Sequence, residues 1–434
     1  MTTSSRSGLP LAGSPDPLRV LIVDDSAFMR ASLRHIVGNT PGFLVVGEAG
    51  DGIAAVEAIR RLSPDIVTLD IDMPRMNGIE VLRDVRPTPG ALPAFIMVSA
   101  FTTQGAAMTL AALRAGAMDF VPKASEHFQV DLAQVGELLR AKLAAAATIT
   151  GRSALPPLPA APAAPVPAAV PAPVSRMTRP PVPPRPVPRP APMLAPAPAK
   201  APAAEGCGPL RPAAPPVVAV PAPSPAAPPR LRTRLIDAGP PDVVVVAAST
   251  GGPQTLPDLL APMVPYRAPV VVAQHIPPMF SRSLADTLAD LLKVPVVEAA
   301  DGTDLAAGTV YILPGGHNAE VVRRRPGVLA VKVVDGGGAV YRPNADILFR
   351  SAALNARRPV GVVLTGMGND GCEGARALAQ RGCPVLAQDP AAAVIWGMPR
   401  AVIDAGLASE VHGAAALGQR LAAMAGQCGG GGLS

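Results

Sequence analysis

The sequence predicts two α/β domains, each organised on a parallel β-sheet, that are joined by a proline-rich segment. The length of 434 residues suits two or more domains. Near both ends of the chain, short apolar segments alternate with segments of helical periodicity, which is typical of parallel sheets covered by helices. Between Thr148 and Asp242 this periodicity is absent, so the two periodic regions are predicted to fold separately.

The first periodic region begins at Leu18 and predicts a doubly wound sheet of five parallel strands. Helical stretches such as Gly52–Leu62 separate the strand segments, and in this stretch Ile53, Val56 and Ile59 recur about once per helical turn. The predicted strands are Arg19–Val23, Phe43–Gly47, Ile66–Leu69, Ala94–Val98 and Phe120–Val121.

Polar side chains follow four of these strands, at the points where the strands end. Asp24 and Asp25 follow the first strand, Asp70 the third, Ser99 the fourth and Lys123 the fifth. The carboxyl ends of parallel strands share one edge of a sheet, so these side chains are predicted to meet. Clustered carboxylates need a cation to stay ionised, and a ligand set made only of oxygen favours Mg²⁺. A phosphoryl group drawn there by the cation and the lysine would form an acyl phosphate on Asp70.

The first domain closely resembles a two-component receiver domain in four motifs: DDS at 24–26, LDIDMPRMNG at 69–78, MVSA at 97–100 and DFVPK at 119–123. The resemblance covers the whole domain and implies a flavodoxin-like fold. It implies Asp70 as the phosphoacceptor and Mg²⁺ held by Asp24, Asp25 and Asp70. The implied phosphoryl-sensing residues are Ser99, Phe120 and Lys123.

The segment between the two regions has the composition of a linker. Between Gly151 and Arg230 it holds 28 of the 55 prolines, with mostly Ala, Val and Arg besides, and too little bulky apolar surface for a core. Its eight basic residues and one acid carry a net charge of +7, against +6 for the whole chain. The remaining chain is therefore nearly neutral, so the basic overall charge does not indicate a nucleic-acid-binding domain.

The second periodic region, from about Asp242 to Ala425, predicts another α/β domain with a mostly parallel sheet. Helices such as Glu373–Gln380, or turns, separate its strand segments. Thr309–Leu313 and Leu329–Val334 could form an antiparallel pair beside the parallel sheet, because a short and mostly polar stretch separates them. The predicted strands are Val243–Ala248, Pro269–Ala273, Val296–Glu298, Thr309–Leu313, Leu329–Val334, Val360–Leu364 and Val385–Gln388.

Three of these strands lead into side chains that together can perform nucleophilic catalysis. Ser249, His275 and Asp370 are predicted to converge at one edge of the sheet. There His275 would act as base for the Ser249 hydroxyl, and Asp370 would orient the imidazole. Each residue alone has a simpler explanation, namely a phosphate-binding turn, a buried structural histidine and a helix cap. Their coincidence at one edge favours catalysis.

The second domain resembles the chemotaxis protein-glutamate methylesterase family, CheB, in five motifs: AASTGGPQTL at 247–256, QHIPPMFSRSLA at 274–285, YILPGGHN at 311–318, LTGMGNDG at 364–371 and WGMPR at 396–400. Receiver, linker and this domain also follow the order of the family. The resemblance implies hydrolysis of glutamyl methyl esters on methyl-accepting chemoreceptors and deamidation of some receptor glutamines, in chemotaxis adaptation.

The resemblance also implies roles for residues and partners. The catalytic residues of the family map onto Ser249, His275 and Asp370, with the Met367 amide and Thr250 at the oxyanion and substrate. No cofactor is implied for ester hydrolysis. The implied phosphodonor is a chemotaxis histidine kinase, and contact with membranes is expected only through the receptors.

Two other functions are weighed against this one. The first is a catalytically silent adaptor controlled by phosphorylation, which the intact trio of catalytic residue types disfavours. The second is a DNA-binding response regulator, which is disfavoured because no helix-turn-helix with a basic recognition helix follows the linker. No nucleic-acid partner is therefore expected.

The remaining sequence features predict a cytoplasmic protein. The four cysteines show no CxxC spacing, and the chain has neither an apolar signal core nor an apolar span of membrane length. The predicted boundaries are a disordered tail at 1–17, the receiver at 18–140, a Pro/Ala-rich linker at 149–238, the methylesterase domain at 240–425 and a Gly-rich tail at 426–434.

Overall fold

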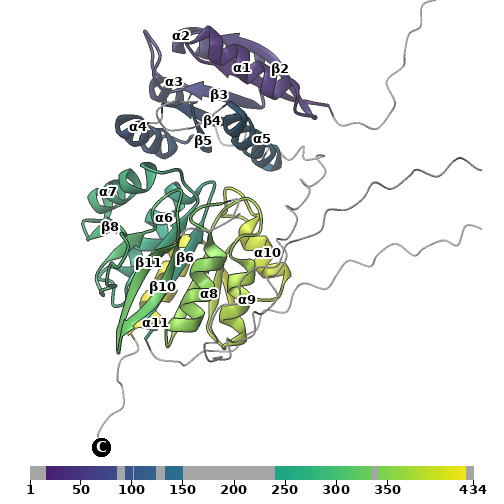
Figure 1. Cartoon of the computed structure of the whole chain (residues 1–434). Helices are drawn as coiled ribbons and strands as arrows, with labels where there is room; N and C mark the ends of the chain where they lie inside the picture. The colour runs from purple at the N-terminus through teal and green to yellow at the C-terminus, as the bar shows by residue number, and fades with distance from the viewer. Residues whose placement is uncertain are drawn as a thin grey trace, which may run out of the picture. The chain divides into compact units, whose positions relative to one another are not determined.

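The computed structural model describes residues 16–85, 93–100, 102–123, 132–149, 240–334 and 341–426. The predicted linker at 149–238 and the two predicted tails lie outside the described residues, except for a few positions at their edges. The predicted domain boundaries therefore stay predictions. The chain forms two α/β domains (Figure 1).

Five parallel strands form the sheet of the first domain: β1 (Leu18–Val23), β2 (Phe43–Ala49), β3 (Ile66–Asp70), β4 (Ala94–Ser99) and β5 (Asp119–Pro122). Their order is β2-β1-β3-β4-β5, which is the flavodoxin-like order and confirms the predicted fold class. Successive residues of β1 face opposite sides of the sheet, so Val20 and Ile22 pack in one core and Leu21 and Val23 in the other.

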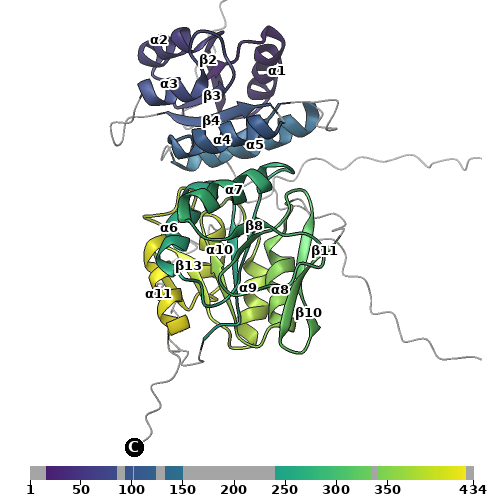
Figure 2. The ribbon, with the colours of Figure 1, turned by 90° about the vertical axis from the view of Figure 1, so that its left-hand side faces the viewer.

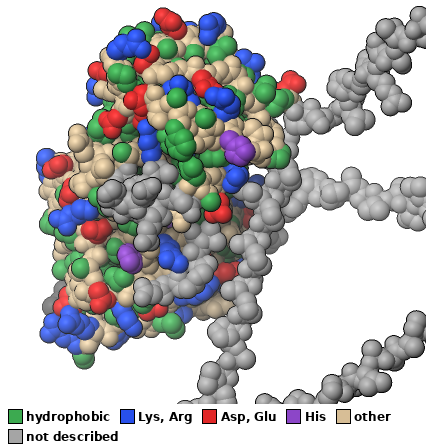
Figure 3. Space-filling model, turned by 45° about the horizontal axis from the view of Figure 1, so that its top comes forward, with side chains coloured by type: hydrophobic (Ala, Val, Ile, Leu, Met, Phe, Trp, Pro, Cys, Tyr) green, Lys and Arg blue, Asp and Glu red, His purple; other side chains and the backbone are tan. Residues whose placement is uncertain are grey.

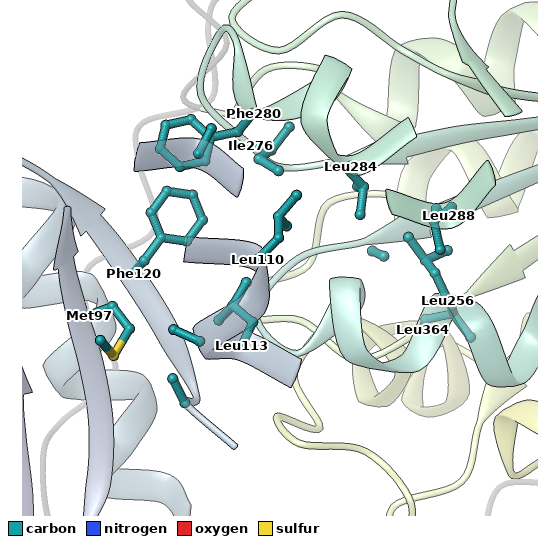
Figure 4. Close-up of a cluster of buried hydrophobic side chains, with 14 of the residues drawn as sticks. Met97, Leu110, Leu113, Phe120, Leu256, Ile276, Phe280, Leu284, Leu288 and Leu364 are labelled. Carbon is teal, nitrogen blue, oxygen red and sulfur yellow. The ribbon is translucent and has the colours of Figure 1, made fainter. Parts of the chain in front are cut away.

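Five helices cover this sheet: α1 (Ala27–Gly38), α2 (Gly52–Leu62), α3 (Gly78–Asp84), α4 (Thr103–Arg114) and α5 (Leu132–Ile149). Apolar residues of α1 and α5 fill the core on one face, and those of α2, α3 and α4 fill the core on the other. Figure 4 labels Leu110 and Leu113 of α4, with Met97 and Phe120 of the strands, in this second core.

Seven parallel strands form the main sheet of the second domain: β6 (Val243–Ala248), β7 (Val270–Gln274), β8 (Val296–Glu298), β9 (Val310–Ile312), β12 (Pro359–Val363), β13 (Val385–Gln388) and β14 (Glu410–His412). Their order is β14-β13-β12-β6-β7-β9-β8. β6 lies in the middle, and all six of its residues are buried. A strand buried on both faces explains its run of four valines and two alanines.

Helices cover both faces of the second sheet (Figure 2). They are α6 (Gly252–Leu260), α7 (Phe280–Leu292), α8 (Ala345–Asn355), α9 (Cys372–Gln380), α10 (Met398–Asp404) and α11 (Ala414–Gly426), with a short 3₁₀ helix at Ala261–Met263. α6, α7 and α11 pack in the core that contains Val244 and Val246, whereas α8, α9 and α10 pack in the core that contains Val243 and Val245. Figure 4 labels Leu256 of α6 and Leu284 and Leu288 of α7 in the first of these cores.

The predicted antiparallel pairing of Thr309–Leu313 with Leu329–Val334 is wrong. β9 lies inside the main sheet, parallel to β7 and β8. The antiparallel partner of β11 (Val328–Val334) is β10 (Asn318–Arg325), which forms a separate two-stranded sheet with it. β10 has the sequence NAEVVRRR, and its charged outer end hides the alternation of buried and exposed residues that marks a strand.

Charged side chains of both signs are interspersed over the face of the molecule in Figure 3. Within the described ranges, no helix is both long enough and apolar enough to cross a bilayer.

Candidate functional site

The strand order of the second domain brings three strand ends to one place. β6 pairs in parallel with β12 on one side and with β7 on the other, so the residues that follow these strands lie at one edge of the sheet. The chain passes from β6 to β7 and later returns to fill β12 on the opposite side. Such a reversal of winding is where α/β sheets form their sites. Ser249, His275 and Asp370 all lie at this edge.

Ser249 sits in a tight turn between β6 and α6. Its amide donates to the Thr365 carbonyl at 3.0 Å, and its side chain is buried. Gly251 has a φ of +80°, and a Cβ atom at this position would lie 2.6 Å from Cβ of Val394. Both the backbone conformation and the close packing therefore require glycine at position 251.

Two side chains contact the imidazole of His275: Asp370 contacts a ring nitrogen, and Tyr341 contacts one face of the ring. Nε2 hydrogen-bonds to Oδ2 of Asp370 at 2.7 Å. The ring of Tyr341 stacks on the imidazole, with ring centroids 4.7 Å apart and planes 5° from parallel. The backbone amide of His275 donates to the Ala248 carbonyl at 2.9 Å, which fixes the start of this loop against the end of β6.

Asp370 is anchored by backbone amides at the N-terminus of α8. Ala345 donates to Oδ2 at 2.7 Å and Asp346 to Oδ1 at 3.1 Å, while Gly371 donates to Oδ1 at 2.9 Å. Burial acts to raise the pKa of Asp370, but the hydrogen bond and charge of His275 and these amides outweigh it and lower the pKa. The carboxylate therefore stays ionised. It accepts hydrogen bonds from the first turn of α8, whose N-cap is Asn344, and it does not cap the following helix α9, whose N-cap Gly371 has no side-chain cap bond.

The two nitrogens of His275 consequently have different chemistry. An ionised carboxylate accepts a hydrogen bond, so Nε2 carries the proton when the imidazole is neutral. Nδ1 is then a lone-pair acceptor, and it is buried without a hydrogen-bond partner among the described residues. Within the described residues, the imidazole of His275 hydrogen-bonds directly to Asp370. Ser249 lies at the end of the neighbouring strand and makes no hydrogen bond to the imidazole.

Met367 and Thr250 lie on the loops that flank Ser249. Thr250 follows it directly, and the Thr250 carbonyl accepts from the Thr365 hydroxyl at 2.9 Å. Met367 is part of the loop after β12, and the hydrogen bonds found within the described ranges include none donated by its amide. An amide without a protein acceptor is what an oxyanion would require.

The first domain gathers its polar residues at the corresponding edge of its own sheet. Carboxylate oxygens of Asp24, Asp25 and Asp70 all lie within 4.8 Å of one another. Nζ of Lys123 lies 2.7 Å from Oδ2 of Asp70 and 3.1 Å from Oδ2 of Asp24. Burial raises the pKa of Asp70 to about 6, partly opposed by Lys123, and burial also raises the pKa of Asp24.

These three carboxylates fit a divalent cation. Oδ2 of Asp24 is buried and lacks a hydrogen bond of good geometry, although the Lys123 ammonium is near. Burying several carboxylates with one lysine leaves negative charge uncompensated, and a hard cation such as Mg²⁺ takes oxygen ligands of this kind.

The two remaining receiver positions are both buried. The Ser99 hydroxyl donates to the Gly105 carbonyl at 3.2 Å, and Phe120 packs in the core of the domain on β5.

Two features of the catalytic edge have no local signal in the sequence. Tyr341 is separated from His275 by 66 positions, and nothing in its own surroundings marks it as a partner of the imidazole. The amides that bind the Asp370 carboxylate include those of α8, although the position of Asp370 in the sequence, just before α9, predicts a cap of α9. Both contacts depend on how distant segments pack.

Comparisons with known proteins agree over both domains. A family model described as CheB methylesterase matches residues 244–421, and one described as response regulator receiver domain matches residues 20–132. A protein-glutamate methylesterase/protein-glutamine glutaminase of Alkalilimnicola ehrlichii is 39% identical over 423 residues, which are 94% of this chain and 99% of that protein. One from Oleidesulfovibrio alaskensis is 38% identical over 404 residues, which are 91% of this chain and 95% of that protein.

A solved structure, the catalytic domain of Thermotoga maritima CheB methylesterase, is 35% identical and spans 42% of this chain and 98% of its own, with a TM-score of 0.40. With both family models matched in order and curated relatives aligned over nearly their whole length, the chain belongs to the protein-glutamate methylesterase/protein-glutamine glutaminase family, CheB, whose members join a receiver domain to a methylesterase domain.

Proposed function

We propose that the protein removes methyl esters from glutamate residues of methyl-accepting chemoreceptors, and deamidates some receptor glutamines, through Ser249, His275 and Asp370. It would serve chemotaxis adaptation under the control of phosphorylation at Asp70. The observation that carries the proposal is the His275–Asp370 hydrogen bond of 2.7 Å, anchored on the amides of α8 at the strand edge where Ser249 lies.

The chemistry follows from the two nitrogens of His275. Asp370 holds the proton on Nε2, so Nδ1 takes the proton of the Ser249 hydroxyl as its oxygen attacks the carbonyl carbon. The new C–O bond gives a tetrahedral oxyanion, which the Met367 amide would stabilise. When this intermediate collapses, the bond to the methoxy oxygen breaks, and the proton on Nδ1 leaves with methanol. From a glutamine, ammonia leaves in the same way.

Water completes the cycle. It replaces the leaving group, gives a proton to Nδ1 and attacks the acyl-enzyme. Collapse of the second intermediate breaks the bond to the Ser249 oxygen, returns that proton to it and releases a glutamic acid side chain, which loses its own proton to solvent. Because Asp370 stays ionised, it offsets the charge of the imidazolium in both halves of the cycle.

The receiver would supply the control. Mg²⁺ held by Asp24, Asp25 and Asp70 would neutralise charge on an incoming phosphoryl group, with a chemotaxis histidine kinase as donor. Lys123 contacts the Asp70 carboxylate, which supports the proposal that it would contact a phosphoryl oxygen on that residue. The hydroxyl of Ser99 and the ring of Phe120 would respond to that group.

The test is methanol release from methylated receptor. Ser249→Ala should reduce turnover by at least ~10³-fold, because the nucleophile is lost. Ser283→Ala is the matched control, since it removes another buried serine hydroxyl of the same domain, one that donates to the Met279 carbonyl. Turnover by Ser249→Ala at the rate of the wild type would exclude the mechanism. A wild-type protein without turnover on any methylated receptor would instead support the adaptor.

A further inference from the structure

Gln274 joins the backbones of the proposed nucleophile and the proposed base. It is the last residue of β7, and its side chain is 2% exposed. Nε2 donates to the carbonyl of Ser249 at 2.9 Å and to the carbonyl of His275 at 3.1 Å. One carboxamide therefore connects the turn that carries the hydroxyl to the loop that carries the imidazole.

The Gln274 carboxamide makes this connection at the point where the backbone pairing of β6 with β7 ends. Ala248 and Gln274 are the last paired residues of β6 and β7, and the His275 amide makes the next backbone bond, to Ala248. Beyond that point the chain continues into α6 after β6 and into α7 after β7. The carboxamide of Gln274 thus extends the link between them after the backbone ladder has stopped.

Two observations fix the orientation of this carboxamide. Both acceptors are carbonyl oxygens, so the NH₂ group must face them, and the opposite orientation would set three oxygens against one another. Oε1 then lies buried without a hydrogen-bond partner among the described residues. Leaving a buried oxygen unpaired is costly, which indicates that the two bonds made by Nε2 determine the position of the side chain.

Gly252 provides the space that the carboxamide occupies. A Cβ atom at Gly252 would overlap Oε1 of Gln274 and would also lie 2.9 Å from Cβ of Ala248. The second glycine of the turn is therefore needed by Gln274, whereas the first, Gly251, is needed by the backbone conformation and Val394.

We propose that Gln274 is a positioning residue that sets the separation of the Ser249 hydroxyl and Nδ1 of His275. This inference rests on the proposed function of Ser249 and His275. Gln274 forms none of the bonds made or broken in the reaction. Its loss should lower kcat, because displacement of reacting groups by about 1 Å costs up to ~10²-fold, while substrate binding should change little.

The first experiment compares Gln274→Met with a matched control, Asn355→Leu. Each change replaces a carboxamide by an apolar side chain of similar size. Nδ2 of Asn355 also donates to two carbonyls, of Val321 at 3.0 Å and Ser351 at 3.1 Å, but at the opposite end of α8 from the Asp370 anchor. Gln274 is buried and Asn355 is half-buried, so thermal unfolding of both full-length variants records the stability that each loses.

Steady-state hydrolysis of methylated receptor then separates the roles. Gln274→Met should lower kcat by about 10–100-fold with KM within about threefold, while Asn355→Leu keeps the kcat of the wild type. Equal kcat in both variants would reduce Gln274 to a structural residue, and a raised KM at unchanged kcat would make it a substrate contact. Either result overturns the inference alone, whereas a wild type without turnover overturns the proposed function and this inference with it.

The second experiment uses Gly252. Gly252→Ala should reproduce the loss of kcat, because the added methyl group displaces the Gln274 carboxamide. With Gln274→Ala as the second single variant, the double variant Gly252→Ala/Gln274→Ala should lose less kcat than the product of the two single losses, since both changes act on the carboxamide, although the added methyl group still meets Cβ of Ala248. Losses that multiply in the double variant would show that the two residues act separately and would overturn the proposed link.

Discussion

The two nitrogens of the His275 imidazole face different surroundings, and this difference predicts which nitrogen would act as the base. Asp370 occupies Nε2, so Nδ1 is the atom available to the Ser249 hydroxyl. In the serine-protease arrangement the carboxylate binds Nδ1 and Nε2 is the base. The same chemistry is possible with the nitrogens exchanged, provided that the ring is prevented from turning. The stacked ring of Tyr341 supplies that restraint.

Two substitutions at Tyr341 distinguish the contribution of the stacked ring from that of its hydroxyl group. Tyr341→Phe keeps the stacking and should keep kcat within about twofold, whereas Tyr341→Leu should lower kcat by about 3–10-fold, the value of one aromatic contact. Turnover of methylated receptor measures both. Equal losses in the two variants would indicate that the hydroxyl, and not the stacking, is what matters.

The raised pKa of Asp70 predicts how the receiver responds to pH. Burial brings this pKa to about 6, so the carboxylate takes up a proton as the pH falls through that value. Because Mg²⁺ binds the ionised form, its affinity should weaken steeply below about pH 6 and level off above about pH 7. Calorimetric titration of the full-length protein with Mg²⁺ across this range measures the effect. Constant affinity between about pH 5 and about pH 7.5 would contradict it, and Asp70→Asn should reduce the pH dependence without removing it, because burial also raises the pKa of Asp24.

At the scale of an element, close contacts constrain the turn from β6 into α6, which carries Ser249. Its shape requires glycine at position 251 for the backbone and at position 252 for packing. Hydrogen bonds from Thr365 and Gln274 then fix the carbonyls of Thr250 and Ser249. Ser249, the proposed nucleophile, is thus held by contacts from the ends of both strands that flank β6.

Substitution of Gly251 tests this constraint on stability. Gly382, which follows α9, has a φ of +74°, and a Cβ atom added there would meet no atom within 4 Å, so Gly382→Ala should cost only the conformational penalty of about 1–2 kcal/mol. Gly251→Ala has the same penalty plus the overlap with Val394, which adds about 1–3 kcal/mol. Urea unfolding of both variants measures the difference. Equal destabilisation would show that Val394 moves aside freely.

Most elements of both sheets follow from sequence patterns, because buried parallel strands are short apolar runs whose ends are visible. β6, β8 and β13 begin and end as predicted, and so does α2. β10 and β14 are missed because partly exposed, charged strands lack such a run. The wrong pairing of β9 with β11 has the same cause. When β10 is not recognised as a strand, β9 is the strand that precedes β11 in the sequence.

The residues of the candidate site also include some that the sequence predicts and others that it does not. Ser249, His275 and Asp370 are predictable because each follows a strand whose position is evident from the apolar runs. Gln274 and Tyr341 are not predictable as partners, since a hydrogen bond to a neighbouring turn and a stacked ring depend on tertiary packing. The assignment of roles to all of these residues stays a prediction until turnover is measured.

At the scale of the whole molecule, the chain carries two candidate sites that are constructed in the same way, from polar residues that follow parallel strands. One gathers carboxylates and a lysine, and the other gathers a hydroxyl, an imidazole and a carboxylate. The two share no residue, so their chemistries are expected to be separable by single substitutions.

This separation predicts opposite phenotypes for two variants. Ser249→Ala should still accept a phosphoryl group from a small phosphodonor with Mg²⁺, while releasing no methanol. Asp70→Asn should take up no label, yet keep the turnover that the wild type shows without a phosphodonor. Asp72→Asn is the control, because this neighbouring acid is exposed. Radiolabel and methanol assays on the same samples give both readouts, and a label that persists in Asp70→Asn would refute the assignment of the phosphoacceptor.

The central place of β6 has a consequence for synthesis on the ribosome. The strands on its two sides are completed far apart in the sequence, β7 early and β12 late. A nascent polypeptide that has emerged only as far as α8 holds the hydroxyl and the imidazole but not the carboxylate that orients it. If the three residues act as proposed, hydrolysis is expected only once the later part of this domain has left the exit tunnel.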